Sequence, residues 1–164
     1  MRLTVSAVGK LRAGPEKMLA ESYATRIRQM GPAVSLSPLS LIEVDAKKRL
    51  EGAELVEHEA ALLRAQISSG ARLVTLDERG ESWSSERFAK SLSDWRDQGA
   101  PETVFAIGGH HGLDPSLRRD AVLSFGRLTW PHLLVRVMLL EQIFRAITIL
   151  SGHPYHRAGI ERPL

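Results

Sequence analysis

The segment TVFAIGGHHGLDP, residues 103–115, joins an apolar run to a cluster of glycines. An apolar run that breaks at Gly108 and Gly109 is typical of a buried strand whose end brings the backbone close to a ligand. Asp114 and Pro115 then predict a short helix or turn over 114–121. We therefore expect a ligand-binding loop directly after a core strand.

Short apolar runs alternate with longer amphipathic segments on both sides of this loop. The alternation predicts an α/β fold, with a five- to six-stranded, mostly parallel sheet and helices on both of its faces. In such a sheet, ligands bind beyond the carboxyl ends of the strands, where the glycines lie. The expected strands are 2–8, 38–45, 71–77, 102–109 and 122–130, and the expected helices are 15–30, 46–70, 84–99 and 132–152.

The composition narrows the class of protein. The 164 residues, 43% of them hydrophobic, predict one globular domain over residues 1–164. The absence of cysteine excludes disulfides, thiolate zinc sites and cysteine nucleophiles, and it fits a cytoplasmic protein. The N-terminal segment is too interrupted for a signal peptide, and no apolar run approaches the roughly 18 residues of a membrane span. The net charge of +3 permits nucleic-acid binding without selecting it.

The glycine segment lacks the residues that define several common ligand-binding motifs. It has no lysine followed by serine or threonine, as a P-loop requires, and the first strand is not followed by GxGxxG, as a dinucleotide site requires. There is no GxSxG nucleophile elbow. His110 and His111 are interpreted as solvated loop histidines, and no metal site is expected because no HExxH pair accompanies them. The remaining ligand class is largely apolar or cationic and is held by backbone.

The last expected helix is apolar around most of its circumference. This pattern is typical of a helix buried in a core or in an oligomer interface, and it favours a dimer. Glu141 and Arg145 are one turn apart and are expected to pair, although Arg145, like Arg136, also suits an RNA phosphate. The segment HPYHR at 153–157 is either a polar tail or a group of reactive side chains.

Four motifs of the chain carry a family resemblance: LVTLDERG (73–80), FAIGGHHGL (105–113), LTWPHLLVRVMLLEQIFRA (128–146) and HPYHR (153–157). They resemble those of the ribosomal RNA large subunit methyltransferase H family, within the SPOUT class of methyltransferases. The resemblance implies a C-terminal trefoil knot, a homodimer, and S-adenosylmethionine as methyl donor. It also implies that the enzyme methylates N3 of a pseudouridine in 23S rRNA on the assembled ribosome.

The chemistry of this reaction suggests catalytic residues, and the resemblance implies cofactor contacts. Tyr155, His156 and Arg157 are expected to serve catalysis, with Tyr155 or His156 assisting loss of the N3 proton and Arg157 holding the RNA. His132 is a further candidate for the base. The implied cofactor contacts are Leu76, Gly108, Phe125, Gly126, Arg127, Leu128, Thr129 and Trp130.

Three features depart from the family pattern. His110-His111 replaces a pair that often ends in an acid, Phe144 stands where tyrosine is usual, and residues 158–164 extend beyond the HPYHR motif. Two alternative functions stay open. One is a SPOUT methyltransferase that acts on tRNA, and the other is a non-catalytic protein that binds the ribosome or RNA.

Overall fold

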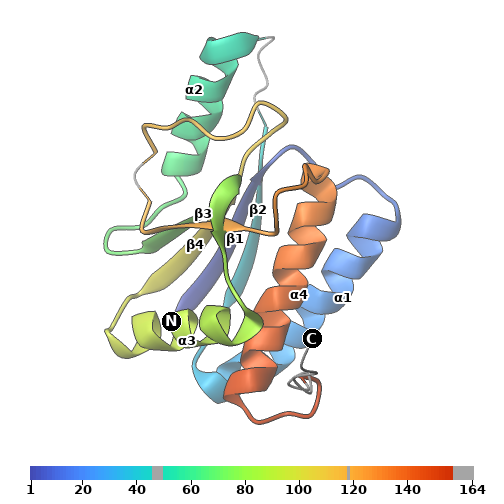
Figure 1. Ribbon diagram of the computed structural model, residues 1–164, viewed down its shortest axis with the longest axis vertical. Helices are drawn as coiled ribbons and strands as arrows, with labels where there is room; N and C mark the ends of the chain where they lie inside the picture. Colours follow the sequence, from blue (N-terminus) through green and yellow to red (C-terminus); the bar gives the residue numbers. More distant parts are fainter. Residues whose placement is uncertain (46–49, 118, 157–164) are drawn as a thin grey trace, which may run out of the picture.

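Five strands form one sheet in the computed structural model, which describes residues 1–45, 50–117 and 119–156 (Figure 1). The strands are β1 (Arg2–Val8), β2 (Leu39–Val44), β3 (Arg72–Ser82), β4 (Glu102–Ile107) and β5 (Ala121–Ser124). Their order in the sheet is β2-β1-β4-β3-β5, and every neighbouring pair is parallel. The predicted parallel sheet of an α/β fold is therefore confirmed, whereas the C-terminal trefoil knot stays a prediction.

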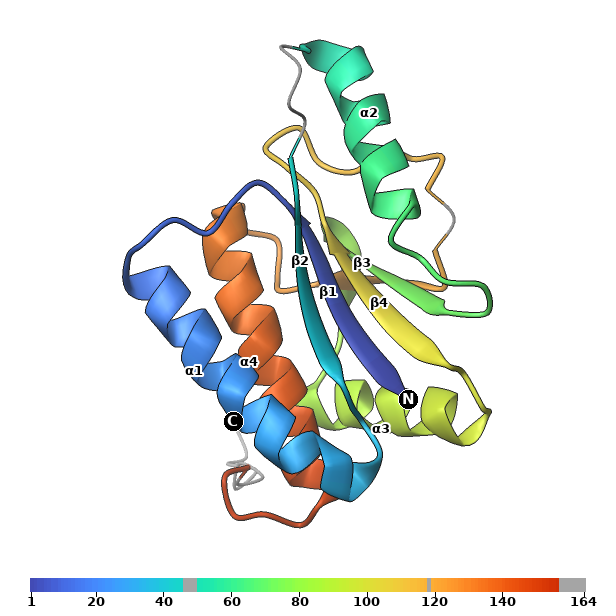
Figure 2. The same cartoon turned by 180° about the vertical axis from the view of Figure 1, so that it is seen from behind.

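Helices cover both faces of the sheet, as predicted. They are α1 (Pro15–Met30), the short 3-10 helix η1 (Gly31–Val34), α2 (Gly52–Arg64), α3 (Ser85–Asp97) and α4 (His132–Leu150). Figures 1 and 2 show α1 and α4 side by side and α2 apart from them. Along β4, Phe105 packs with α1, α3 and α4 while Val104 packs with α2, because successive side chains of a strand point to opposite faces. None of the described helices is long and apolar enough to cross a membrane.

Local sequence signals set several helix boundaries. Pro15 lies in the first turn of α1, and this helix ends at Met30, directly before Gly31. Ser84 caps α3, since its Oγ accepts a hydrogen bond from the backbone N–H of Arg87 at 3.2 Å. Both helices match their predicted ranges closely.

The predicted helix over 46–70 is wrong in its length. Helix α2 begins at Gly52 and ends at Arg64, and residues 46–49 lie outside the described residues. Gly52 starts the helix with a φ of +57° rather than weakening its interior. After Arg64 the chain turns and reaches β3 through Gly70, whose φ is +76°.

Strand β3 is longer than the predicted range 71–77. It continues to Ser82, and its pairing with β5 shifts register between Leu76 and Glu81. A Cβ atom at Gly80 would lie 2.7 Å from the carbonyl oxygen of Val122, so a larger residue would clash with the backbone of β5. Glycine at this position lets the two strands stay close beyond the predicted end.

Strands β4 and β5 are shorter than predicted, because the chain leaves the sheet at glycines. They end at Ile107 and Ser124, before the predicted ends at 109 and 130. The backbone N–H of Gly126 donates to the Oγ of Ser124 at 3.1 Å, and Gly126 has a φ of +107° that favours glycine. Of the two predicted outcomes for 114–121, the described residues show a turn and not a helix.

One buried arginine ties α4 to the carboxyl ends of β1 and β2. Arg136 is only 4% exposed, and its Nη2 donates to the carbonyl oxygens of Val8 and Gly9, the latter at 2.7 Å. Its Nη1 lies 3.3 Å from a carboxylate oxygen of Glu43 on β2. Burial lowers the pKa of Arg136, and the nearby Glu43 carboxylate opposes that change. The planar guanidinium reaches both strands at once, which a single ammonium group does less well.

Replacing Arg136 with methionine is expected to lower the free energy of unfolding by about 3 kcal/mol, because two backbone carbonyl oxygens lose their charged donor. Urea unfolding of Arg136→Met measures this change. Arg28→Met, at an exposed position of α1, is the matched control and is expected to unfold like the wild type. Equal stability of the two variants would contradict the anchoring role of Arg136.

Candidate functional site

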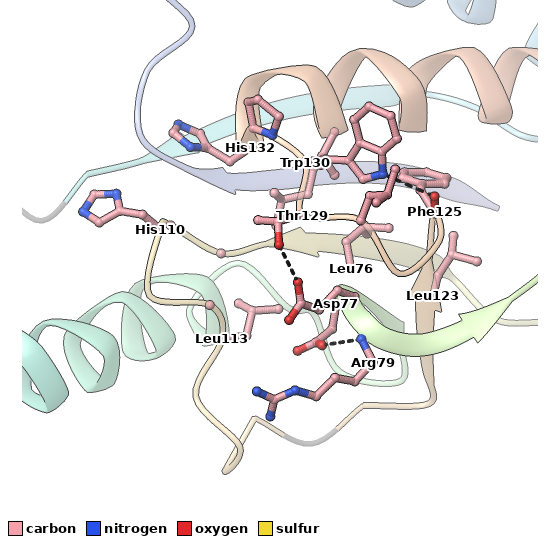
Figure 3. A pocket seen from close by; sticks show the side chains of 18 of the residues that line it. Leu76, Asp77, Arg79, His110, Leu113, Leu123, Phe125, Thr129, Trp130 and His132 are labelled. Atoms are coloured by element: carbon pink, nitrogen blue, oxygen red, sulfur yellow. Dashed lines mark hydrogen bonds between the residues drawn. The ribbon is translucent and has the colours of Figure 1, made fainter.

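A cavity of about 720 Å³ lies at the carboxyl ends of β4 and β5, beside the first turn of α4 (Figure 3). Its walls come from residues 76–79 of β3, from the segment after β5, and from residues 108–112, which we call the glycine loop. This is the edge of a parallel sheet at which ligands bind. The sequence prediction of a ligand-binding loop after β4 therefore points to the edge that holds this cavity.

The glycine loop is a tight backbone turn. The backbone N–H of Gly112 donates to the carbonyl oxygen of Gly109 at 3.1 Å, and Gly112 has a φ of +80°. A Cβ atom at Gly108 would lie 2.6 Å from the carbonyl oxygen of Gly112. Glycine at position 108 is thus required for the loop to close on itself, and the closed loop presents backbone to the cavity.

The opposite wall is largely apolar and is held by side-chain hydrogen bonds, drawn as dashed lines in Figure 3. The Nε1 of Trp130 donates to the carbonyl oxygen of Phe125 at 3.3 Å, which folds the segment after β5 back on itself. The hydroxyl of Thr129 donates to a carboxylate oxygen of Glu78 at 3.1 Å and links this wall to β3. Leu128 and Trp130 remain 69% and 38% exposed, so apolar surface is free to meet a ligand.

Seven of the eight residues expected to contact a cofactor line this one cavity. The exception is Arg127, which is exposed and does not line it, although both of its chain neighbours do. Their contact with a cofactor stays a prediction. The seven lining residues are Leu76, Gly108, Phe125, Gly126, Leu128, Thr129 and Trp130.

Two acidic residues of the cavity were not predicted from the sequence. Asp77 and Glu78 follow Leu76 on β3 and line the cavity. The backbone N–H of Arg79 donates to a carboxylate oxygen of Asp77 at 2.8 Å, which fixes that side chain. Carboxylates beside an apolar wall favour a cationic ligand. The sequence did contain a signal for these two acids: they directly follow the buried apolar run of β3, and the carboxyl ends of parallel strands are where ligands bind.

His132 begins α4 at one end of the cavity, and Figure 3 shows it beside His110. Burial lowers the pKa of the His132 imidazole, and the positive charges of Arg136 and His110 act in the same direction. A neutral imidazole can accept a proton near neutral pH. Of the three residues considered as a base, His132 is the one that lines the cavity.

His110 and His111 are exposed side chains of the glycine loop, as predicted, with their ring centroids 4.9 Å apart. Both also line the cavity, so the exposed loop forms part of its rim. Across residues 1–45, 50–117 and 119–156, no group of three or more histidines and acids is arranged to hold a metal ion.

Tyr155 and His156 of the tail lie against α3 and α4, away from the cavity. The hydroxyl of Tyr155 donates to a carboxylate oxygen of Glu141 at 3.1 Å, and its ring packs edge-on against Phe144 at 4.7 Å between centroids. The Nε2 of His156 lies 2.9 Å from a carboxylate oxygen of Glu86. These contacts dock the tail on the body of its own chain.

The docked tail and the cavity are separated along α4. Glu141 follows His132 by nine residues, which corresponds to about 13 Å of helix. The predicted ion pair between Glu141 and Arg145 is confirmed, so Arg145 is engaged within the protein. Arg157 lies outside the described residues. A single chain therefore does not bring Tyr155 and His156 to its own cavity.

Burial raises the pKa of Tyr155 to about 12, and Tyr23 and Glu141 act in the same direction. The folded chain thus favours the neutral phenol of Tyr155. The stability that this preference contributes is fully present below pH 10 and is lost as the pH rises through about 12. The difference in tyrosinate absorbance between the wild type and Tyr155→Phe is expected to titrate near pH 12. A midpoint near pH 10 in this difference would contradict docking of the tail.

Comparisons with known proteins agree with this geometry. A family described as "Predicted SPOUT methyltransferase" matches residues 1–156. A protein of Rhodopseudomonas palustris (strain HaA2), named "Ribosomal RNA large subunit methyltransferase H", is 53% identical over 160 residues, which cover 96% of this chain and 100% of the relative. Proteins of the same name from Ruegeria pomeroyi and Sinorhizobium fredii are 51% and 48% identical, over 96% of this chain and 99% and 100% of the relatives. The chain therefore belongs to the SPOUT methyltransferase family, in its ribosomal RNA large subunit methyltransferase H group.

Proposed function

We propose that this chain transfers a methyl group from S-adenosylmethionine to N3 of a pseudouridine in 23S rRNA on the assembled ribosome. The observation that carries the proposal is the convergence of seven expected cofactor residues on one cavity at the carboxyl ends of the strands. The substrate class follows the name of the relatives, which states a ribosomal RNA of the large subunit. The proposal includes one domain over residues 1–164 with a C-terminal trefoil knot, and a cytoplasmic location, where ribosomes are found.

The residues of the cavity fit S-adenosylmethionine. The glycine loop offers close backbone to a flat adenosyl group, and Leu76 and Phe125 supply apolar contact. The carboxylates of Asp77 and Glu78 suit the positive charge of a sulfonium. The glycine loop itself contains no lysine or arginine, and Arg79, which lines the cavity, comes from β3 instead.

When bound, S-adenosylmethionine would supply the sulfonium methyl group that is transferred to N3, and N3 would give up its proton to a group of the chain. The chain must align the acceptor nitrogen with the methyl group and accept that proton. His132 suits the second task, because its imidazole lines the cavity and burial favours its neutral form. The proton thus passes from N3 to an imidazole nitrogen of His132.

We also propose a homodimer in which the tail of one chain completes the cavity of the other. Met18 and Leu19 on α1 are 72% and 49% exposed, and Leu19 lines a second, smaller cavity of about 250 Å³. Phe125 lines both cavities, so this apolar surface is continuous with the cofactor cavity. An apolar patch of this kind is suited to a second copy of the chain. In the dimer, the tail residues Tyr155, His156 and Arg157 act at the partner's cavity.

Transfer of labelled methyl from S-adenosylmethionine to ribosomes that lack the modification tests the substrate. Label is expected in the 23S rRNA of assembled ribosomes, with little in naked 23S rRNA or in tRNA, because the ribosome supplies part of the binding surface. Label in tRNA alone would support the tRNA methyltransferase alternative. Absence of both label and cofactor binding would support the non-catalytic alternative.

Replacing His132 with alanine is expected to lower kcat by about 100-fold, since a positioned proton acceptor contributes rate of this order. Affinity for S-adenosylmethionine, measured by calorimetry, is expected to stay close to that of the wild type. Imidazole added to the buffer is expected to restore part of the rate, which a loss of folding would not permit. An unchanged kcat in His132→Ala would remove His132 as the base.

A further inference from the structure

A buried acid lies directly behind the glycine loop. Glu59 on α2 is only 7% exposed, and its Oε2 has no hydrogen-bond partner among the described residues. A Cβ atom at Gly109 would lie 3.2 and 3.3 Å from the two carboxylate oxygens of Glu59. Glycine at position 109 therefore lets the carboxylate pack against the loop backbone, on the side away from the cavity.

A second buried acid of the same chain, Glu102, has partners for both of its carboxylate oxygens and serves as a comparison. Glu102 on β4 is 4% exposed, and one of its oxygens accepts a hydrogen bond from Thr4 at 2.6 Å. Its other oxygen accepts from Ser68, and Arg2 lies 3.5 Å away as a counter-charge. Burying an unpaired carboxylate oxygen costs stability, and Oε2 of Glu59 has no hydrogen-bond partner among the described residues. Glu59 therefore calls for an explanation other than support of the fold.

The charged groups around Glu59 connect it to the cavity. Burial raises the pKa of the Glu59 carboxyl and the negative charge of Asp45 adds to this, whereas His110, His111 and His58 oppose it. His110 and His111 belong to the glycine loop and line the cavity, while Glu59 does not. An ionised carboxylate at this place attracts the two loop imidazoles when they carry a proton.

We propose that Glu59 is a positioning residue for the cofactor cavity, which holds the glycine loop in its ligand-accepting form through contact with Gly109 and attraction to His110 and His111. This inference rests on the proposed function. Glu59 needs no contact with the cofactor, because the loop it supports forms a wall of the cavity. Its effect is on cofactor affinity and not on the rate of methyl transfer once the cofactor is bound.

Glu59→Gln tests the role, since glutamine keeps the shape of the side chain and removes its charge. The dissociation constant and KM for S-adenosylmethionine are expected to rise by about five-fold, while kcat on ribosomes stays unchanged. The melting temperature is expected to stay the same or rise, because the substitution removes a buried charge whose Oε2 has no partner within residues 1–45, 50–117 and 119–156. Glu57→Gln, with the same change at an exposed position of α2, is the control and is expected to behave like the wild type.

A double-mutant cycle separates loop positioning from general support of the fold. In a chain that already carries His110→Asn and His111→Asn, Glu59→Gln is expected to weaken cofactor binding by less than it does alone. A fully additive effect would overturn the link through the imidazoles, and a lower melting temperature with unchanged cofactor affinity would assign Glu59 to the fold. Equal affinity in Glu59→Gln and the wild type refutes the positioning role alone. A wild-type chain that binds no S-adenosylmethionine refutes the proposed function, and this inference with it.

Discussion

Arg136 sets the relation between the sheet and α4 on which the candidate site depends. Its guanidinium donates to the backbone carbonyl oxygens of Val8 and Gly9 at the end of β1. His132 lies one turn earlier on the same side of α4, so an anchored arginine also fixes the imidazole at the end of the cavity. The Glu43 carboxylate that pairs with Arg136 also accepts a hydrogen bond from the backbone N–H of Leu11 at 2.7 Å. One buried contact thus holds β1, β2, α4 and the segment leading to α1.

The features that the sequence predicts well are governed by neighbours along the chain. Pro15 and Ser84 mark the starts of α1 and α3, and the glycine loop follows an apolar run that is visible in one short segment. The length of β3 depends instead on Gly80, which permits close approach to Val122 in a distant segment. Docking of the tail depends in the same way on partners far from it in the chain, such as Glu86 for His156. Contacts between distant segments leave no periodic pattern within either segment. The length of β3 and the docking of the tail could therefore not be predicted from the sequence pattern alone.

The two buried acids lie at opposite ends of β4, and we assign them different roles: Glu102 supports the fold, and Glu59 supports the candidate site. Glu102 is the first residue of β4, and its partners come from β1 and from the turn before β3. Two hydroxyl donors and one arginine therefore compensate the charge of its carboxylate. Glu59 packs beyond the other end of β4, where the chain has left the sheet and backbone must stay free to meet a ligand. A chain optimised for stability alone would place an apolar or fully paired side chain there. Residues that depart from the pattern of paired or apolar buried side chains gather at functional sites. The cavity lies at this end of β4.

The length of α4 constrains how the tail can take part in the reaction. The helix runs from the cavity to the docked tail, and about 13 Å of it separates His132 from the Tyr155 partner Glu141. A rigid helix cannot bring these two ends together, so Tyr155 either supports the fold of its own chain or acts at a place other than this cavity. The apolar surface around Leu19 meets the cavity through Phe125, which is where a second copy would have to pack to carry its tail there. In the proposed dimer, the cofactor wall and the tail would be parts of one site assembled from two chains, and the proposed base His132 would come from the chain that holds the cofactor.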